Sequence, residues 1–349
     1  MRAAILGCGQ VSIPQLRAWS QIEGVEVVAL YNRTLSKAQE RAREFGISQE
    51  HVYSDFEALL QTEKVDFVDV ATAPQAHREL VEAAAAHGLP ALCQKPMATD
   101  LEDARLMISA CNKAGILFSI NENWRWRSHY REVKHLLDQG IIGQPRFVRF
   151  TSHRNITLPG PGGGQPVLLT RQAYTATMDQ LIVFEWGTHL IDTTRFLFGN
   201  PERIYARMER VSPYFRGEDR AVITLELLNL TGLIDISWAT VGDEAAERRA
   251  ATYLEDFTVE GETGSIEILP EPQKLLRVCT RTQSWEQAAY PGTWEEEYQA
   301  SYTAAQRHFY ECLRTGGTPE TTAQDNLKTL EITFAAYESA ARGQAIVLA

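Results

Sequence analysis

The stretch AAILGCGQVS, residues 3–12, decides the fold. Its first four residues are an apolar run typical of a buried strand, and Gly7 and Gly9 follow directly. A glycine at the first position allows a tight turn, and one at the second lets backbone amides approach a pyrophosphate at the start of the next helix. The third glycine of that dinucleotide-binding pattern is Ser12 here, so the motif taken alone is weak.

The segments after this turn repeat the same arrangement. Apolar runs at 25–30, 65–70 and 116–120 alternate with helix-like segments, which predicts a doubly wound parallel sheet, a Rossmann domain over residues 1–120. A glycine turn without a ligand is the alternative. In this repeated context we favour a bound nucleotide, with further candidate contacts in the turn and after the third strand: Gln10, Val11, Thr72, Pro74 and His77.

The segment YNRTLSK after the second strand bears on the choice of cofactor. An NAD enzyme usually has Asp or Glu about 20 residues past the glycines to bind the ribose 2′-hydroxyl, and Asn32 stands there instead. Arg33, Thr34 and Lys37 offer a guanidinium, a hydroxyl and an ammonium to a 2′-phosphate. The segment therefore favours NADP(H) over NAD(H). The alternative is a polar turn that caps the next helix through Thr34 or Ser36.

From residue 121 the pattern changes to short strand-like runs joined by turns, of which NLTG at 229–232 predicts a hairpin. These runs predict an α+β domain over 121–349 with a large, mostly antiparallel sheet. A helical run at about 322–342 is expected to pack back on the core. A Gly/Pro-rich segment at 158–180 could be a lid, an oligomer arm or a disordered insertion.

Composition and charge exclude several classes of protein. The chain has 349 residues and a net charge of −11 with no basic block, which argues against a nucleic-acid partner. Because it has no apolar run of roughly 18 residues, we expect no membrane span. Its five cysteines form no CxxC pair, a pattern that suits reduced thiols in a cytoplasmic protein.

The stretch FEWGTHLID, residues 184–192, places Glu185, His189 and Asp192 in an apolar setting. If the stretch is helical, the three side chains lie on one face. Because unpaired carboxylates and imidazoles are costly there, the group is either a satisfied network or cap, or a reaction centre. A metal site is a third alternative, but no HExxH pattern appears and the other histidines lack a matching spacing, so we expect no metal.

Motifs spread over nearly the whole chain carry a resemblance to a known family. They are AILGCGQVS, CQKP at 93–96, INENWRWR at 120–127, HLLDQGIIGQPRFVRF at 135–150, EWGTHLID, and NLKTLEITFAAYESAARGQAIVL near the end. In these motifs the chain resembles the glucose–fructose oxidoreductase / inositol dehydrogenase (Gfo/Idh/MocA) family. INENWRWR, together with the region around EWGTHLID, is similar to a branch that includes D-apiose and related sugar dehydrogenases.

The resemblance implies roles for individual residues. Lys95 of CQKP matches the lysine that contacts the reacting hydroxyl and the cofactor, and Gln94, also a cofactor candidate, replaces the family's glutamate. His189 matches the catalytic histidine, and Glu185 stands where the family usually has Asp, to orient His189 or bind a substrate hydroxyl. An imidazole accepts and returns a proton near neutral pH, and an ammonium stabilises a developing alkoxide. We expect His189 and Lys95 to converge on one oxygen beside the nicotinamide.

Substrate contacts are predicted mainly in NENWRWR, which combines hydrogen-bonding groups with aromatic faces suited to a sugar. We take Asn123, Arg125 and Trp126 as candidates, although the tryptophan could serve packing alone. Tyr174 in the Gly/Pro-rich segment and Asp192 are further candidates, and Asp192 is equally suited to a structural hydrogen bond.

These expectations describe an NADP(H)-preferring dehydrogenase of a sugar, polyol or cyclitol that forms a homodimer or homotetramer. Two alternatives stay open: an imine or enone reductase with the same fold, and a non-catalytic regulatory protein that senses a nucleotide. The presence of both Lys95 and His189 favours an enzyme over a regulator.

Overall fold

The computed structural model describes residues 1–160, 162–241, 255–269 and 273–348. The chain divides into two compact units, Met1–Trp126 with Tyr298–Leu330, and Arg127–Glu297 with Glu331–Ala349. The sequence placed a domain boundary at residue 120. The first unit instead runs to Trp126 and takes in a segment from near the C-terminus.

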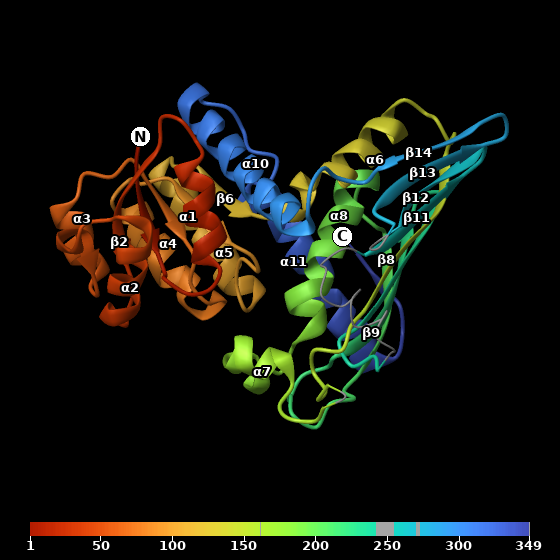
Figure 1. Cartoon of the computed structure of the whole chain (residues 1–349), viewed down its shortest axis with the longest axis horizontal. Coiled ribbons are helices and arrows are strands. Elements are labelled where there is room, and N and C mark those ends of the chain that lie inside the picture. Colours follow the sequence, from red (N-terminus) through yellow and green to blue (C-terminus); the bar gives the residue numbers. More distant parts are fainter. Residues whose placement is uncertain (161, 242–254, 270–272, 349) are drawn as a thin grey trace. The chain divides into compact units, whose positions relative to one another are not determined.

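The first unit is built on a six-stranded parallel sheet in the order β3-β2-β1-β4-β5-β6. Figure 1 draws its strands in red to yellow among the helices that connect them. Its strands are β1 (Arg2–Leu6), β2 (Glu26–Tyr31), β3 (Val52–Tyr53), β4 (Phe67–Val70), β5 (Ala91–Gln94) and β6 (Phe118–Asn121). Its connecting helices are α1 (Ser12–Ser20), α2 (Leu35–Phe45), α3 (Phe56–Thr62), α4 (His77–Ala86) and α5 (Leu101–Ala114). This strand order is that of the dinucleotide-binding fold, as the sequence predicted.

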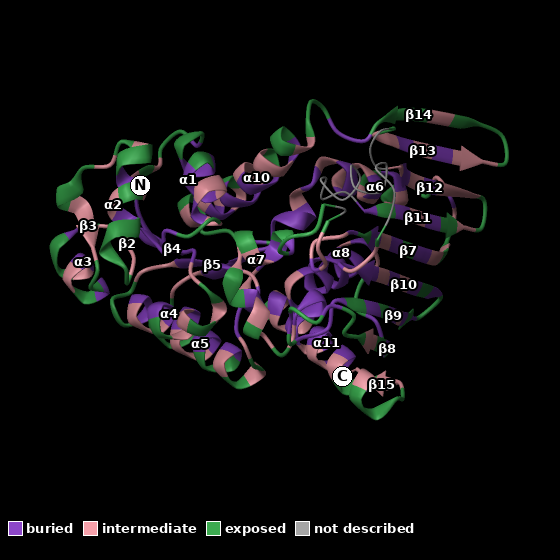
Figure 2. Cartoon of the chain, turned by 60° about the horizontal axis from the view of Figure 1, so that its bottom comes forward, coloured by how far each residue is buried: buried purple, intermediate pink, exposed green. Residues whose placement is uncertain are grey.

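Two neighbouring strands of this sheet, β4 and β5, are buried along their whole length. Every residue of β4 and β5 is buried, as the purple ribbons in Figure 2 show. Strands covered on both faces carry no polar alternation, which is why the sequence displayed them as continuous apolar runs.

A helix from far along the chain completes this core. α10 (Trp294–Thr315) contributes Phe309, which is 1% exposed. The Phe309 ring lies 5.6 Å from the ring of Phe67 in β4, and Phe67 lies 5.0 Å from Trp19 of α1. The Rossmann core therefore depends on residues that the sequence had assigned to the second domain.

The second unit is built on a nine-stranded sheet in the order β14-β13-β12-β11-β7-β10-β9-β8-β15. Its strands are β7 (Pro145–His153), β8 (Arg203–Glu209), β9 (Arg220–Leu227), β10 (Leu230–Ser237), β11 (Asp256–Gly261), β12 (Gly264–Leu269), β13 (Leu275–Thr280), β14 (Ser284–Ala288) and β15 (Ile346–Val347). Among the described strands, β7 and β10 pair in parallel and the remaining pairs are antiparallel. The predicted α+β domain with a mostly antiparallel sheet is confirmed.

The helical elements of this unit are α6 (Ser128–Asp138), α7 (Val167–Arg171), the 3₁₀ turn η4 (Ala173–Thr177), the π-helix η5 (Val183–Gly187) and α8 (Thr188–Phe198). α11 (Ala323–Arg342) ends in it, where the sequence predicted a helix over 322–342. The Gly/Pro-rich segment contains α7 and η4, and its residue 161 lies outside the described residues. None of the described helices is long and apolar enough to cross a membrane.

The hairpin between β9 and β10 lies beside the predicted one, but its turn is formed by Leu228 and Asn229. Gly232, expected in the turn, lies inside β10 opposite Leu225. A Cβ atom at Gly232 would lie 3.3 Å from Leu225 Cβ. Here the glycine accommodates close packing within the sheet, which accounts for the misplaced turn.

Candidate active site

The two glycines after β1 differ in what surrounds them. Gly7 has φ +112°, and a Cβ atom there would lie 2.6 Å from Ala71 O and 2.8 Å from Thr72 Cγ2. A Cβ atom on Gly9 would meet no described heavy atom within 4 Å. The fold itself therefore requires Gly7, whereas the space beside Gly9 is open.

The start of α1 beside this space suits an anion. The exposed Gln10 and the N-cap residue Val11 lead into the helix, and none of the described residues in its first turn is acidic. A valine side chain cannot accept a hydrogen bond from the first N–H groups of the helix, which form the positive end of the helix dipole. Ser12, in place of the third glycine, is buried and donates to Gly9 O at 2.7 Å, so it braces the turn.

Asn32 links the glycine turn to the loop after β2. Its Oδ1 accepts the Cys8 N–H at 3.1 Å, and its Nδ2 donates to Thr34 O at 2.9 Å. Arg33, Thr34 and Lys37 are exposed at the start of α2. Thr34 is the N-cap residue, but among the described atoms its hydroxyl makes no cap bond. This geometry argues against the capping alternative for Thr34 and leaves three polar groups facing solvent.

His77 holds together two loops at the carboxyl edge of the sheet. It is fully buried, and its Nδ1 and Nε2 lie 3.0 Å from Met97 O and Thr72 O respectively. Burial lowers the pKa of this imidazole. His77 therefore holds the loops after β4 and β5 in place, and a cofactor at this sheet edge would depend on it through these loops. The loop after β4 continues through Thr72 into Pro74.

A chain of buried hydrogen bonds ends at Lys95, the residue after β5. The side chain of Gln94, 4% exposed, accepts the Lys95 N–H through Oε1 at 2.7 Å. In the amide orientation that satisfies both neighbours, Gln15 accepts from Gln94 Nε2 at 3.0 Å and donates to Asp69 at 3.2 Å. Trp19 Nε1 donates to Asp69 at 2.7 Å, and burial raises the pKa of this carboxyl to about 7.

This network accounts for Gln94 in place of the glutamate that the family resemblance implies at this position. A glutamate would present an oxygen to the oxygen of Gln15, and it would add a negative charge near the buried carboxyl of Asp69. Gln15, Trp19 and Asp69 were not predicted from the sequence as part of this site. The available signal was Asp69 itself, a carboxylate inside the apolar run VDFVDV.

Asn123 and Arg125, predicted to bind substrate, have partners from the C-terminal part of the same unit. Asn123 is 1% exposed and donates from Nδ2 to Ser301 Oγ at 2.8 Å. Arg125 is 5% exposed and donates to Glu320 O at 3.0 Å and to Asp325 Oδ2 at 2.5 Å. These contacts attach the loop after β6 to α10 and α11; a role in substrate binding stays a prediction.

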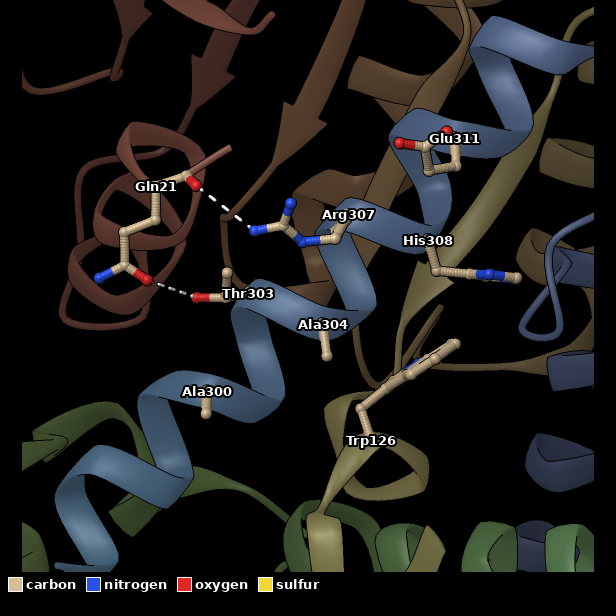
Figure 3. A pocket seen from close by; sticks show the side chains of 8 residues that line it. All are labelled: Gln21, Trp126, Ala300, Thr303, Ala304, Arg307, His308 and Glu311. Carbon is tan, nitrogen blue, oxygen red and sulfur yellow. Dashed lines mark hydrogen bonds between the residues drawn. The ribbon is translucent and has the colours of Figure 1, made fainter. Parts of the chain in front are cut away.

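Trp126 lines a cavity of about 510 Å³ on α10. Figure 3 shows the Trp126 indole beside the His308 ring, and the two ring centres are 4.7 Å apart. The cavity is completed by Gln21, Ala300, Thr303, Ala304, Arg307 and Glu311. Thr303 and Arg307 donate to Gln21 at 2.9 and 3.4 Å.

Glu185 and His189 lie on two different kinds of helix. Glu185 belongs to the π-helix η5, and α8 follows with His189 in its first turn. The stretch is helical, as the one-face arrangement requires, but it includes a π-turn, a feature often found at functional sites. His189 is 3% exposed, and Asp192 is fully buried with an oxygen 3.6 Å from Arg195. That ion pair fits the structural alternative for Asp192.

The Trp186 indole lies beside His189 within the second unit, and Arg154 lies over that indole. The Trp186 ring stands edge-on to the His189 ring, with centroids 6.0 Å apart, and the Arg154 guanidinium lies 4.0 Å from the Trp186 ring centre. Tyr174 lies in η4 and is 49% exposed, and its role in substrate binding stays a prediction.

These residues fit a dinucleotide better than a metal. The open space at Gly9, the α1 N-terminus and the exposed groups at the start of α2 suit a pyrophosphate and a ribose. Within the described ranges, no group of three or more His, Cys, Asp or Glu side chains could hold a metal ion.

Comparison with known proteins identifies the family of this chain. Residues 1–122 match the model of an oxidoreductase family with an NAD-binding Rossmann fold, and residues 130–267 match the Gfo/Idh/MocA C-terminal domain. The chain belongs to the Gfo/Idh/MocA oxidoreductase family. The family resemblance inferred from the sequence, and with it the prediction of an oxidoreductase, is confirmed.

Relatives of this family member match it from end to end. D-apiose dehydrogenase of Paraburkholderia graminis is 37% identical over 99% of this chain and 89% of its own length. D-apiose dehydrogenase of Rhizobium rhizogenes is 35% identical, with 99% and 97% covered. The crystal structure of an oxidoreductase from Agrobacterium radiobacter with NAD+, L-tartaric acid and magnesium is 34% identical, with 99% and 98% covered and a TM-score of 0.90.

Proposed function

We propose that this chain is a nicotinamide-dependent dehydrogenase of a sugar, polyol or cyclitol, with D-apiose the first substrate to test. The observation that carries the proposal lies in the first unit: Lys95 follows β5 at the same sheet edge as the Gly7–Gly9 turn after β1. Ligands of open parallel sheets bind at that edge. The two D-apiose dehydrogenases support the substrate class, because their likeness covers 99% of this chain.

Oxidation of a carbinol needs a hydride acceptor and a base for the hydroxyl proton. A bound nicotinamide supplies the hydride acceptor. We assign the base to His189, because an imidazole takes up and returns a proton near neutral pH. The Lys95 ammonium donates a hydrogen bond to the same oxygen and stabilises its developing charge. Glu185 orients the imidazole or binds a neighbouring hydroxyl.

The finer parts of the proposal concern cofactor choice and assembly. Preference for NADP(H) is supported by Asn32 in place of an acid and by the exposed Arg33, Thr34 and Lys37. The Agrobacterium radiobacter relative was crystallised with NAD+, so both cofactors belong in the assay. We also propose that the protein is cytoplasmic and that it forms a homodimer or homotetramer. Sedimentation equilibrium would test the oligomeric state.

The test is a turnover screen read at the nicotinamide absorbance band. Purified protein is mixed with NADP+ or NAD+ and a panel of D-apiose, other pentoses, polyols, cyclitols and L-tartrate, and with reduced cofactor and a panel of imines and enones. The proposal expects reduction of the cofactor by at least one sugar, polyol or cyclitol. Turnover only with imines or enones would replace it by the reductase alternative, and cofactor binding without any turnover would replace it by the regulator.

A further inference from the structure

One glutamate satisfies three backbone N–H groups at the start of the segment that carries Glu185 and His189. The Glu218 carboxylate accepts the Leu181 N–H at 3.1 and 3.2 Å and the Val183 N–H at 3.1 Å. The backbone carbonyl of Glu218 accepts the Ile182 N–H at 3.0 Å. The first N–H groups of a helix have no partner within the helix, so these three are satisfied by a residue of another segment.

A tyrosine from α11 satisfies the next N–H group and joins the same cluster. The Tyr337 hydroxyl accepts the Phe184 N–H at 3.0 Å and donates to Glu218 Oε1 at 2.6 Å. Four consecutive N–H groups are therefore held by two side chains and one carbonyl. Glu218 is 9% exposed, and burial raises the pKa of its carboxyl, while the hydrogen bonds from Tyr337, Val183 and Leu181 oppose that rise.

The clamped residues pass directly into the π-helix. Val183 and Phe184, whose N–H groups are held, are the first two residues of η5, and Glu185 is the third. A π-turn is rare and has one residue more per hydrogen-bonded ring than an α-turn. If the segment relaxed to a regular α-helix, Glu185 would rotate about the helix axis relative to His189, which lies in the first turn of α8.

We propose that Glu218 and Tyr337 are positioning residues that aim the Glu185 carboxylate through their bonds to the backbone at 181–184. This inference rests on the proposed function, because it concerns the same reaction and the same pair, Glu185 and His189. Neither residue is proposed to touch substrate or cofactor. A small misplacement of a catalytic group lowers turnover while substrate and cofactor still bind.

The test compares two tyrosine variants that lose the same atom. Tyr337→Phe removes the hydroxyl from the clamp. Tyr130→Phe is the matched control, because the buried Tyr130 hydroxyl also bonds to a buried glutamate of the second unit, Glu255 at 3.0 Å, without contact to the 181–184 backbone. We expect kcat to fall about tenfold to a hundredfold in Tyr337→Phe, with cofactor affinity unchanged, and to stay within twofold of the parent in Tyr130→Phe.

Double variants distinguish positioning of Glu185 by Tyr337 from a general structural role of Tyr337. If the clamp acts through Glu185, Tyr337→Phe has little further effect on kcat in a Glu185→Gln background, and it shifts the acidic limb of the kcat/KM pH profile in the parent background. Glu218→Gln, which keeps the shape of the side chain, serves as the second clamp variant and is expected to act in the same direction. These measurements are made well below the melting temperature of each variant.

The outcomes distinguish the two proposals. If Glu185→Gln and His189→Ala both lose turnover while Tyr337→Phe and Glu218→Gln keep it, the positioning inference is overturned and the proposed function stands. Strictly additive effects on kcat, or an equal loss in Tyr130→Phe, overturn it as well. If Glu185→Gln and His189→Ala keep parent turnover, the assignment of the catalytic pair is wrong.

Discussion

Replacing Gly9 by alanine tests the cofactor site without disturbing the fold. Gly9 is not among the glycines with positive φ, and its new Cβ atom would meet no described atom within 4 Å. The free energy of unfolding should therefore stay within about 1 kcal/mol of the parent, with a gain of ~0.4–1 kcal/mol from the less flexible unfolded chain. If the pyrophosphate approaches the backbone here, the added methyl group should weaken cofactor binding by about tenfold or more, which is about 1.4 kcal/mol.

Gly7→Ala is the contrasting variant. The left-handed φ should cost about 1–2 kcal/mol, and the overlap with Ala71 O a further ~1–3 kcal/mol. Unfolding in urea without cofactor gives the stability of both variants, and titration of NADPH and NADH fluorescence gives their affinity. Parent-like cofactor affinity in a folded Gly9→Ala protein would refute a pyrophosphate site beside Gly9. A loss of stability equal to that of Gly7→Ala would refute the open space around the new Cβ atom.

Two further predictions concern charge. Arg33→Ala should raise the Kd for NADP+ by about tenfold or more, the size of a charge-assisted hydrogen bond, and leave the Kd for NAD+ unchanged; equal effects on both would remove the basis for NADP preference. Burial raises the pKa of the Asp69 carboxyl from its ordinary value of 3.8 to about 7 in the folded protein. The neutral form of Asp69 therefore stabilises the fold below pH 3.8, and this contribution is lost as the pH rises through about 7. Between these values the free energy of unfolding should fall with pH more steeply in the parent than in Asp69→Asn, by at most about 1.4 kcal/mol per pH unit; equal slopes in urea unfolding would contradict this.

Local patterns made the first sheet predictable. The apolar runs that became β1, β2, β4 and β6, and the glycine turn after β1, are properties of adjacent residues, and the parallel sheet follows from their alternation with helices. The antiparallel sheet was predictable as a class because its short strand-like runs and the turns that join them are also properties of adjacent residues. Its hairpin was misplaced because Gly232 is needed for packing within β10, and sequence alone does not distinguish a packing glycine from a turn glycine.

The parts that sequence reasoning missed depend on contacts between distant segments. Phe309 completes the core around Phe67, and Ser301 bonds to Asn123, although nothing near these residues in the sequence names their partners. The π-helix is equally hidden, because the stretch FEWGTHLID is compatible with an uninterrupted α-helix. Four N–H groups at its start bond to Glu218 and Tyr337, which have no local relation to it in the sequence.

The most direct test of the central claim is a turnover measurement on His189→Ala with an active sugar or polyol. The variant should bind NADPH and NADH with affinities within about twofold of the parent, because the glycine turn lies in the other unit. Its kcat should fall by about 10²-fold or more, the typical contribution of a positioned base. Turnover within a few-fold of the parent, in a variant that still binds the cofactor, would contradict the account.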